Sequence, residues 1–449
     1  MTSPPQLVYC AVSKPKFDLA TWHAVRVGWA RIASGEPVPA DAFGEPIVRS
    51  ASRPNFVHPA ALDCDNARDA FLSAFTHTRA AAAVLRELPE LSDHHTCELQ
   101  AQFHTAYCRI ASYAHVSESG ACLILSLIEV QSADVIERFE PQKLRAFLNR
   151  LFHTPPTGVS GPRPDDTLSE TTEALFGFRP DFRFRKGSTY LVTFLDEDAA
   201  AKLDYKSVHR LEDGATDDAS EALKVRELDI LYAFAGWGHS TFVARSVPLA
   251  MFLLPGIVSV DGTYAVTTFQ LEQLVGGSAT RAKRLSIAEM EREIASFENY
   301  AFDAEMAEIE FENVRQQFKP WQRGVHDHLF VYWRLRQASV TLQKALRHRL
   351  ERERGRLTVL VARMERRRNI ILGLIALLEL VAVSSSLVAY LELIGRSSRV
   401  ELEGLYASGP YFFLVLAIPA SVLLAVGVFW VLLTRRPVKR KDLASSSRR

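Results

Sequence analysis

Residues 369–395 read NIILGLIALLELVAVSSSLVAYLELIG, and this stretch decides the predicted fold. Within 370–394 the only charged residues are Glu379 and Glu392. A helix of this length is sufficient to cross a hydrocarbon core of about 30 Å with a slight tilt. The range 411–434 carries no charged residue at all. We therefore predict two transmembrane helices near the C-terminus.

Basic residues flank both predicted spans. Arg366, Arg367 and Arg368 precede the first span, and the tail 435–449 that follows the second is also basic. Because Lys and Arg accumulate in cytoplasmic loops, both termini are expected in the cytoplasm and the loop 395–409 on the exterior. The sequence thus predicts an integral protein of the cell (inner) membrane, in contact with membrane lipid.

The long region before the spans has the pattern of a folded domain. Between residues 1 and 277, short apolar runs alternate with helical patterns, which predicts a cytosolic α/β domain with a linker-like loop at 153–166. The five cysteines lack CxxC spacing, as is typical of a reducing compartment. Expected strands are 7–12, 122–130, 189–195, 229–234 and 241–245, and expected helices are 67–88, 96–114 and 141–152.

One further apolar range, 231–260, has nearly the composition of a third span. Arg245, His239 and several Gly and Pro residues interrupt it. Its β-branched and aromatic residues favour two or three buried strands instead.

The expected helix 96–114 presents metal-ligand chemistry on one face. Cys97, His104 and Cys108 share that face, and imidazole and thiolate are good zinc ligands. Cys97 and Cys108 would lie about 16 Å apart at a rise of 1.5 Å per residue, so only His104 and Cys108 could share an ion. A partly buried helix face explains the same pattern, and no cofactor is expected from it.

Two long charged helices of opposite sign are predicted before the first span. The range 286–318 contains nine acidic and two basic residues, whereas 334–368 contains twelve basic and three acidic residues. Pro320 separates them because proline lacks a donor and restricts its predecessor. After this break we predict one continuous helix, 321–394, whose basic stalk 321–369 runs into the span.

The stalk also carries an apolar seam. Leu346, Leu350, Leu357, Leu360 and Met364 approximate a heptad pattern, so association with copies of the chain or with the acidic helix is expected. Solvated charged faces and attraction of the membrane-proximal arginines to anionic lipid are alternative interpretations of the basic run. Nucleic acid is not an expected partner, since the basic stripe continues into a span.

This order of elements resembles the CorA family of divalent-cation transporters. The resemblance implies a homopentamer with an axial pore lined by the first span, and a divalent cation as the transported or regulatory ion. That family carries a Gly-Met-Asn motif at the outer end of the first span. Gly395 matches its glycine, but Arg396 and Ser397 stand in place of Met and Asn, so the family's selectivity is not carried over to this outer mouth.

Glu379 is then the main candidate for function. A charged side chain at this depth costs about 2.5–3.5 kcal/mol, so it is expected to face protein or water. Val383, Ser386 and Tyr390 lie toward the same helix face and are further pore-lining candidates. In an oligomer, Glu379 would form a ring that attracts cations, with Arg366, Arg367 and Arg368 as an inner basic ring. Alternatively, a protonated Glu379 hydrogen-bonds between packed helices.

The predicted fold class is an α/β cytosolic domain followed by a long helical stalk and two C-terminal transmembrane helices, as in CorA. Two functions remain open. The first is a homo-oligomeric ion channel or transporter. The second is a membrane-anchored oligomeric sensor or scaffold, in which the hairpin tethers a ligand- or partner-binding domain. No nucleophile and base pattern predicts an enzyme.

Overall fold

The computed structural model divides into two compact units, Met1–Arg354 and Gly355–Arg449. The residues that the structure describes are 6–34, 48–49, 64, 66–76, 83–103, 108–130, 146, 163–202, 228–276, 286–397, 421–422 and 424–427.

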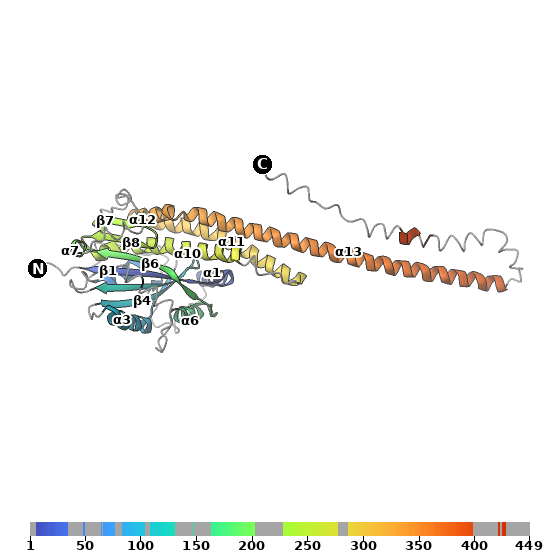
Figure 1. Ribbon diagram of the computed structural model, residues 1–449, viewed down its shortest axis with the longest axis horizontal. Coiled ribbons are helices and arrows are strands. Elements are labelled where there is room, and N and C mark those ends of the chain that lie inside the picture. Colours follow the sequence, from blue (N-terminus) through green and yellow to red (C-terminus); the bar gives the residue numbers. More distant parts are fainter. Residues whose placement is uncertain are drawn as a thin grey trace. The chain divides into compact units, whose positions relative to one another are not determined.

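An eight-stranded mixed sheet organises the first unit (Figure 1). Its strand order is β2-β3-β4-β5-β1-β6-β8-β7. The β6–β8 pair is parallel and the other neighbours are antiparallel. The strands are β1 Leu7–Lys16, β2 Val48–Arg49, β3 Ala83–Glu87, β4 Cys108–Ser117, β5 Cys122–Val130, β6 Arg183–Leu195, β7 Ile230–Ala235 and β8 His239–Ala244.

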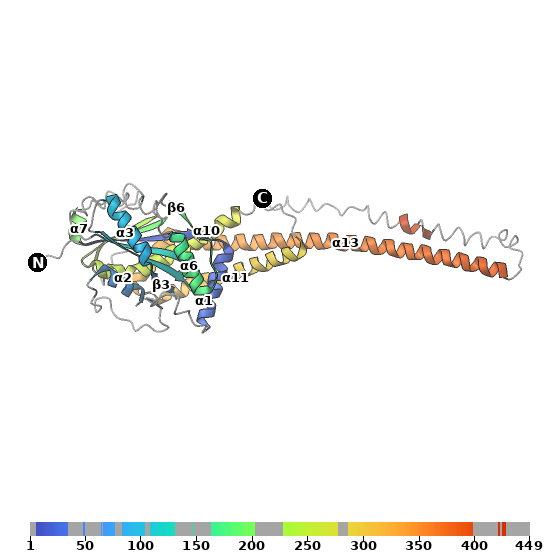
Figure 2. The same ribbon diagram turned by 90° about the horizontal axis from the view of Figure 1, so that it is seen from below.

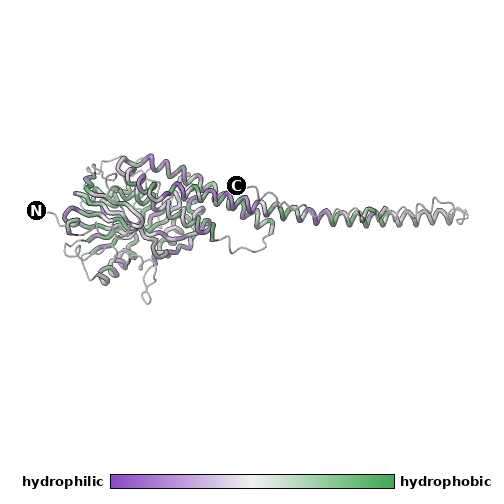
Figure 3. The backbone as a smooth tube through the Cα atoms, turned by 45° about the horizontal axis from the view of Figure 1, so that its top comes forward, coloured by the Kyte–Doolittle hydropathy of each residue, from purple (hydrophilic) through white to green (hydrophobic). Residues whose placement is uncertain are grey.

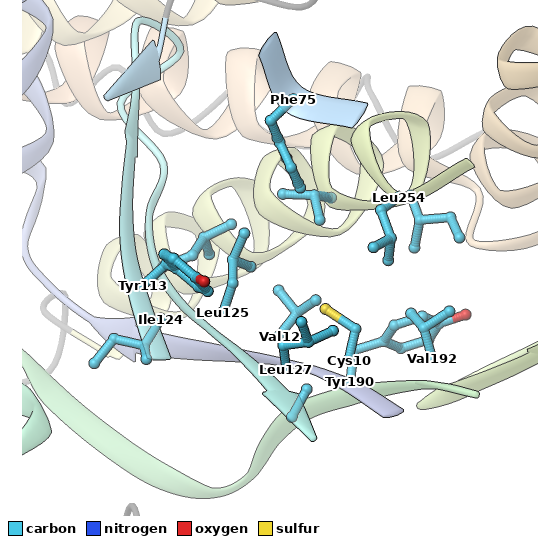
Figure 4. Close-up of a cluster of buried hydrophobic side chains, with 14 of the residues drawn as sticks. Cys10, Val12, Phe75, Tyr113, Ile124, Leu125, Leu127, Tyr190, Val192 and Leu254 are labelled. Atoms are coloured by element: carbon cyan, nitrogen blue, oxygen red, sulfur yellow. The ribbon is translucent and has the colours of Figure 1, made fainter. Parts of the chain in front are cut away.

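The register of the central strands places a continuous apolar surface on one face of the sheet. Val12 pairs with Leu125 on β5 and with Tyr190 on β6, and partners in an antiparallel pair share a face. Figure 4 shows these side chains together with Phe75 and Leu254, which come from the helices above the sheet. The core therefore lies between the sheet and helices α2 (Ala67–Thr76) and α10 (Leu254–Gly276).

The opposite face packs on α3 (Pro89–Phe103) and α6 (Pro164–Phe176), which Figure 1 shows on the other side of the sheet. Helix α1 (Leu19–Ala33) lies beside α6 and α11 (Figure 2). The short helix α7 (Glu197–Lys202) packs against β6 and β8. The first unit is thus a sheet covered by helices on both faces.

The helical run that follows β8 is more deeply buried than any other long helix of this unit. It comprises α9 (Val247–Ala250), the 3-10 turn η6 (Met251–Leu253) and α10. Ser246 caps its start by accepting a hydrogen bond from the Leu249 backbone. The expectation of strands across 231–260 is therefore half right: β7 and β8 are there, but the range from residue 247 onward is helical.

Three helices complete the described chain, namely α11 (Ile287–Gln317), α12 (Pro320–Tyr332) and α13 (Leu335–Ser397). Ser286 and Glu289 form a capping box at the start of α11, in the range predicted for the acidic helix. The predicted continuous helix 321–394 is wrong, because the chain breaks at Trp333 and Arg334. Arg334 has a φ of 50°, and the buried Trp333 packs against Tyr190. Tertiary packing of one indole thus overrides a helical pattern that is locally uninterrupted.

The predicted fold class with two C-terminal transmembrane helices is also wrong. Among the described residues, one helical stretch is long and apolar enough to cross a membrane, and it is Val247–Val275 in the middle of the chain. Of its most apolar window, 78% is buried inside the protein, as in a core helix. Length and hydropathy are alike for a helix covered by lipid and one covered by protein, so this stretch by itself is weak evidence for a membrane span.

The C-terminal segments are described only in part. The predicted first span, 370–394, falls within α13, and hydrophobic residues return along that helix beyond its basic stretch (Figure 3). Because α13 continues through Ser397, the predicted loop does not begin at residue 395. The remainder of that loop, the range 411–434 except 421–422 and 424–427, and the tail 435–449 lie outside the described residues.

Most strand predictions are confirmed, whereas two helix predictions are wrong. β5 has the predicted bounds, and β1, β6, β7 and β8 overlap their predicted ranges. The range 67–88 instead contains α2 followed by β3, and 96–114 contains the end of α3 followed by β4. Pairing of β3 with β4 overrides the helix propensity of the alanine run before Val84. The predicted helix 141–152 lies outside the described residues, apart from residue 146, and so does most of the loop 153–166.

Candidate ligand-binding site

A cavity of about 310 Å³ lies within the first unit, between α10, α11 and the first turns of α13. This volume is at the lower end of the range of about 300–1,000 Å³ for small-molecule sites. Side chains from α1, the β4–β5 turn and α12 complete the wall. The lining residues are Trp22, Ser119, Thr263, Val266, Thr267, Gln270, Ala304, Ala307, Glu308, Phe311, Glu312, Phe330, Leu335, Arg336, Ser339 and Leu342.

One face of α10 supplies the deepest polar group of the wall. Thr263, Val266, Thr267 and Gln270 follow helical spacing and so lie on the same side. Both threonine hydroxyls donate to carbonyls one turn earlier in the helix, at 2.8 Å. Gln270 is only 1% exposed, and among the described residues neither its amide nitrogen nor its amide oxygen has a hydrogen-bond partner. A buried amide without partners is uncommon in proteins and marks a place where a ligand or ordered water binds.

Contacts with β1 and the chain just after it hold α10 in position. The Gln273 amide donates to the Phe17 carbonyl at 2.6 Å, and the Lys14 ammonium donates to the Asp261 carboxylate at 2.7 Å. Burial raises the pKa of Asp261, and the neighbouring Lys14 opposes that rise. These two contacts therefore tie the helix to β1 and to the chain just after it.

The indole of Trp22 forms the wall contributed by α1. Its ring nitrogen donates to the Ser119 carbonyl at 3.0 Å in the β4–β5 turn. The next residue, Gly120, has a φ of +83°, and a Cβ added there would lie 2.4 Å from the Trp22 ring. Only glycine adopts this conformation without strain and also leaves room for the indole. The hydrogen bond and the close contact at Gly120 thus hold the indole against the β4–β5 turn.

Buried ion pairs join α1 to α11. The Arg26 guanidinium donates to both Glu310 oxygens, at 2.8 and 2.9 Å, and its side chain is 8% exposed. One helical turn away from Arg26, the His23 ring lies 2.5 Å from the Asp303 carboxylate. Bidentate pairing of this kind fixes orientation as well as distance, so α11 is held with its lining residues toward the cavity.

A second set of polar contacts joins α11 to α13. Gln343 donates to Glu308 at 2.6 Å, and Glu308 itself lines the cavity. Three ion pairs join the two helices further along. These are Arg347 with Glu305, Arg349 with Glu293 at 3.8 Å, and Arg354 with Glu298 at 2.5 Å. The acidic and basic helices predicted from sequence therefore lie side by side within the first unit.

Aromatic rings back the opposite wall. Phe311 and Phe330 line the cavity, and the buried His326 ring stacks on Phe311 at 4.8 Å between centroids. Burial lowers the pKa of His326. Burial alone would raise the pKa of Asp327, but hydrogen bonds from His326 and Arg315 outweigh it and hold that pKa well below its usual range. The His326 imidazole is therefore neutral where it stacks on Phe311, and the Asp327 carboxylate beside it is ionised.

This lining is suited to binding. Trp22, Phe311 and Phe330 offer flat apolar surfaces, while Gln270 offers one donor group and one acceptor. Among the described lining residues there is no His, Cys or Lys, and the ionisable groups of the wall are Glu308, Glu312 and Arg336. Hydrophobic walls with a few convergent polar groups are typical of small-molecule sites.

The residues singled out from sequence lie elsewhere. Glu379, Val383, Ser386 and Tyr390 are all exposed on α13, in the second unit. The Ser386 hydroxyl donates to the Ala382 carbonyl at 2.9 Å, within its own helix. No contact in the structure tests whether these residues line a pore, so that role stays a prediction.

The other sequence candidates are likewise separate from the cavity. Arg366, Arg367 and Arg368 are exposed on α13, and Gly395, Arg396 and Ser397 form its last turn. Cys108 begins β4 and is buried, so the shared helix face proposed for it and His104 does not exist; His104 itself lies outside the described residues. Within the described ranges, no three His, Cys, Asp or Glu side chains are placed to hold a metal ion.

Sequence reasoning missed Gln270, which is the most informative residue of the cavity. Its signal was a lone amide on the apolar face of a helix in the middle of the chain, but that helix was not predicted as one. No protein-family model, curated protein or solved structure matches the chain. The resemblance to the CorA family consequently stays a prediction.

Proposed function

We propose that the chain is a sensor protein whose first unit binds a small organic molecule in the cavity between α10, α11 and α13. The observation that carries this proposal is the buried, partnerless amide of Gln270 in a cavity of about 310 Å³. A protein interior is normally close-packed, and an open volume beside an unmet amide is unfavourable unless something fills it.

The position of the cavity supports a sensing role. Leu335, Ser339 and Leu342 bring the first turns of α13 into the wall, directly after the left-handed Arg334. Glu308 lines the cavity and also accepts the hydrogen bond from Gln343 on α13. A ligand would therefore touch both helices of the acidic and basic pair and alter how firmly they associate.

Binding can be tested with toluene, indole and benzamide as probes on the purified full chain, by ligand-detected NMR. We expect binding of at least one probe to the wild type. Ala307→Phe, which fills the cavity from α11, abolishes it. Ala295→Phe is the matched control, because Ala295 is exposed on the same helix, and it leaves binding unchanged. Failure of all three probes, or equal binding by Ala307→Phe, contradicts the proposal.

The sensing step has its own measurement. Saturating probe should slow amide hydrogen exchange in α11 and in the part of α13 up to Arg354, since an occupied cavity stiffens both helices. Binding that leaves exchange in both helices unchanged would refute a sensor and leave a passive binding protein.

Lipid association is supported by a separate observation, and we propose it as a second property. The exposed apolar residues of α13 from residue 371 to 383 include Leu372, Leu378 and Val383, and they point around the helix in more than one direction. Contiguous exposed apolar surface marks a protein or membrane contact. Co-flotation of the full chain with anionic liposomes tests it, and a chain that stays with the soluble fraction contradicts it. Ion transport remains a prediction from the sequence.

A further inference from the structure

The chemistry of the cavity wall narrows the kind of molecule that fits it, provided that the proposed function is correct. Gln270 is the starting point, because its amide has no partner among the residues that the structure describes. A carboxamide presents a donor and an acceptor side by side in one plane. Its natural complement is another group with an adjacent acceptor and donor, such as a primary amide or a lactam.

Charge on the wall argues against an anionic ligand. Glu308 and Glu312 both line the cavity; the Glu312 side chain is 46% exposed and lies 3.2 Å from the Arg315 guanidinium. Arg336 also lines it but is exposed. An anion would therefore approach two carboxylates and lose its hydration without a buried cation to compensate.

The Gln270 amide itself supplies no counter-charge, so a cationic group would pair with Glu308 or Glu312 and not with this amide. Gln270 is neutral and 1% exposed, and its immediate neighbours on α10 are Val266 and Thr267. Burial of a charge without a counter-charge is costly. The deep end of the ligand is therefore neutral and polar.

The remaining walls select an apolar, flat body. Trp22, Phe311 and Phe330 contribute aromatic rings, with Leu335 and Leu342 between them along α13. Aromatic rings pack favourably against other rings in offset or edge-to-face geometry. The volume admits a molecule of one or two rings.

We propose that the cavity binds a neutral aromatic molecule carrying a carboxamide-like edge, which pairs with Gln270 through two hydrogen bonds. The Gln270 nitrogen donates to the ligand carbonyl, and the ligand N–H donates to the Gln270 oxygen. The ring of the ligand lies among Trp22, Phe311 and Phe330.

The test compares benzamide, benzoate and toluene, titrated into the full chain by ligand-detected NMR. In the wild type, we expect benzamide to bind about 10-fold more tightly than toluene, the effect of two neutral hydrogen bonds, and also more tightly than benzoate. Gln270→Leu should remove the preference for benzamide over toluene. Gln316→Leu, at an exposed position of α11, should retain it.

Each outcome separates this inference from the proposed function. Equal binding of benzamide and toluene to the wild type overturns the inference, because it means that only ordered water hydrogen-bonds to the Gln270 amide. The proposed binding of a small molecule in the cavity is then still supported. If neither molecule binds, the inference fails, and the proposed function fails with it only if indole does not bind either. Gln270→Met, a straight-chain replacement of similar length, serves as the second variant should Gln270→Leu not fold. The comparison of benzamide with benzoate needs no variant, and tighter binding of benzoate also overturns the inference.

Discussion

Replacement of Gln270 by leucine should stabilise the ligand-free protein, although most substitutions of buried residues destabilise. The amide nitrogen and oxygen are both buried, and no group in the described part of the chain is their partner. Each unsatisfied buried polar group costs about 1–3 kcal/mol, so the two lower limits together set an expected gain of about 2 kcal/mol. Leucine keeps the apolar contacts with the neighbouring core and restores no polar group that needs a partner.

Urea unfolding followed by tryptophan fluorescence measures this gain, because Trp22 lies in the cavity wall. Gln316→Leu is the control: an exposed substitution should change the free energy of unfolding by no more than about 0.5 kcal/mol. A loss of about 1 kcal/mol or more in Gln270→Leu would refute the reasoning, since it would show that the amide is already hydrogen-bonded to ordered water in the free protein.

Three further predictions concern the framework of the site. Arg26→Met should lower the free energy of unfolding by about 2–3 kcal/mol, because it leaves the Glu310 carboxylate, 30% exposed, without its buried partner. Arg354→Gln, at the exposed end of the helix pair, should cost less than about 1 kcal/mol. Calorimetry that gives the two variants equal losses contradicts this prediction. Gly120→Ala should destabilise by about 1–3 kcal/mol and shift the tryptophan emission, since the added methyl meets the indole at a positive φ; unchanged melting and emission refute it. Burial lowers the pKa of His115 from 6.5 to about 4, so as the pH falls the unfolded chain takes up a proton on this residue before the folded chain does. The free energy of unfolding therefore falls between pH 6.5 and 4, by about 3 kcal/mol in total. His115→Gln should flatten that decline in urea titrations across this window, and an unchanged slope contradicts the prediction.

Local patterns were sufficient for much of the first unit. Strand β5 was predicted at its observed bounds because its residues, apart from Ser126 and Glu129, form an apolar run in a buried central strand. Ser286 and Glu289 have the spacing of a capping box and indicate the start of α11, and Pro320 indicates the start of α12. These signals lie within a few residues of the feature that they determine.

Other elements required contacts from distant parts of the chain. The residues of β3 lie in a range predicted as helix, yet they form a strand because β4 offers them a partner. The break at Trp333 and Arg334 depends on an aromatic cluster with Tyr190 and Trp237, far away in sequence. Neither partner is visible in a local window.

The sequence by itself determined which segments need apolar cover and which carry charge of each sign, because periodicity and composition are properties of short stretches. Only the tertiary structure decided what provides that cover. It placed the apolar helix Val247–Val275 inside the protein, paired acidic α11 with the basic start of α13, and left Gln270 beside a cavity without a partner. The physical reason is that burial and hydrogen bonding arise between residues that are distant in the chain. Whether the Gln270 amide has a hydrogen-bond partner therefore depends on the tertiary contacts around it.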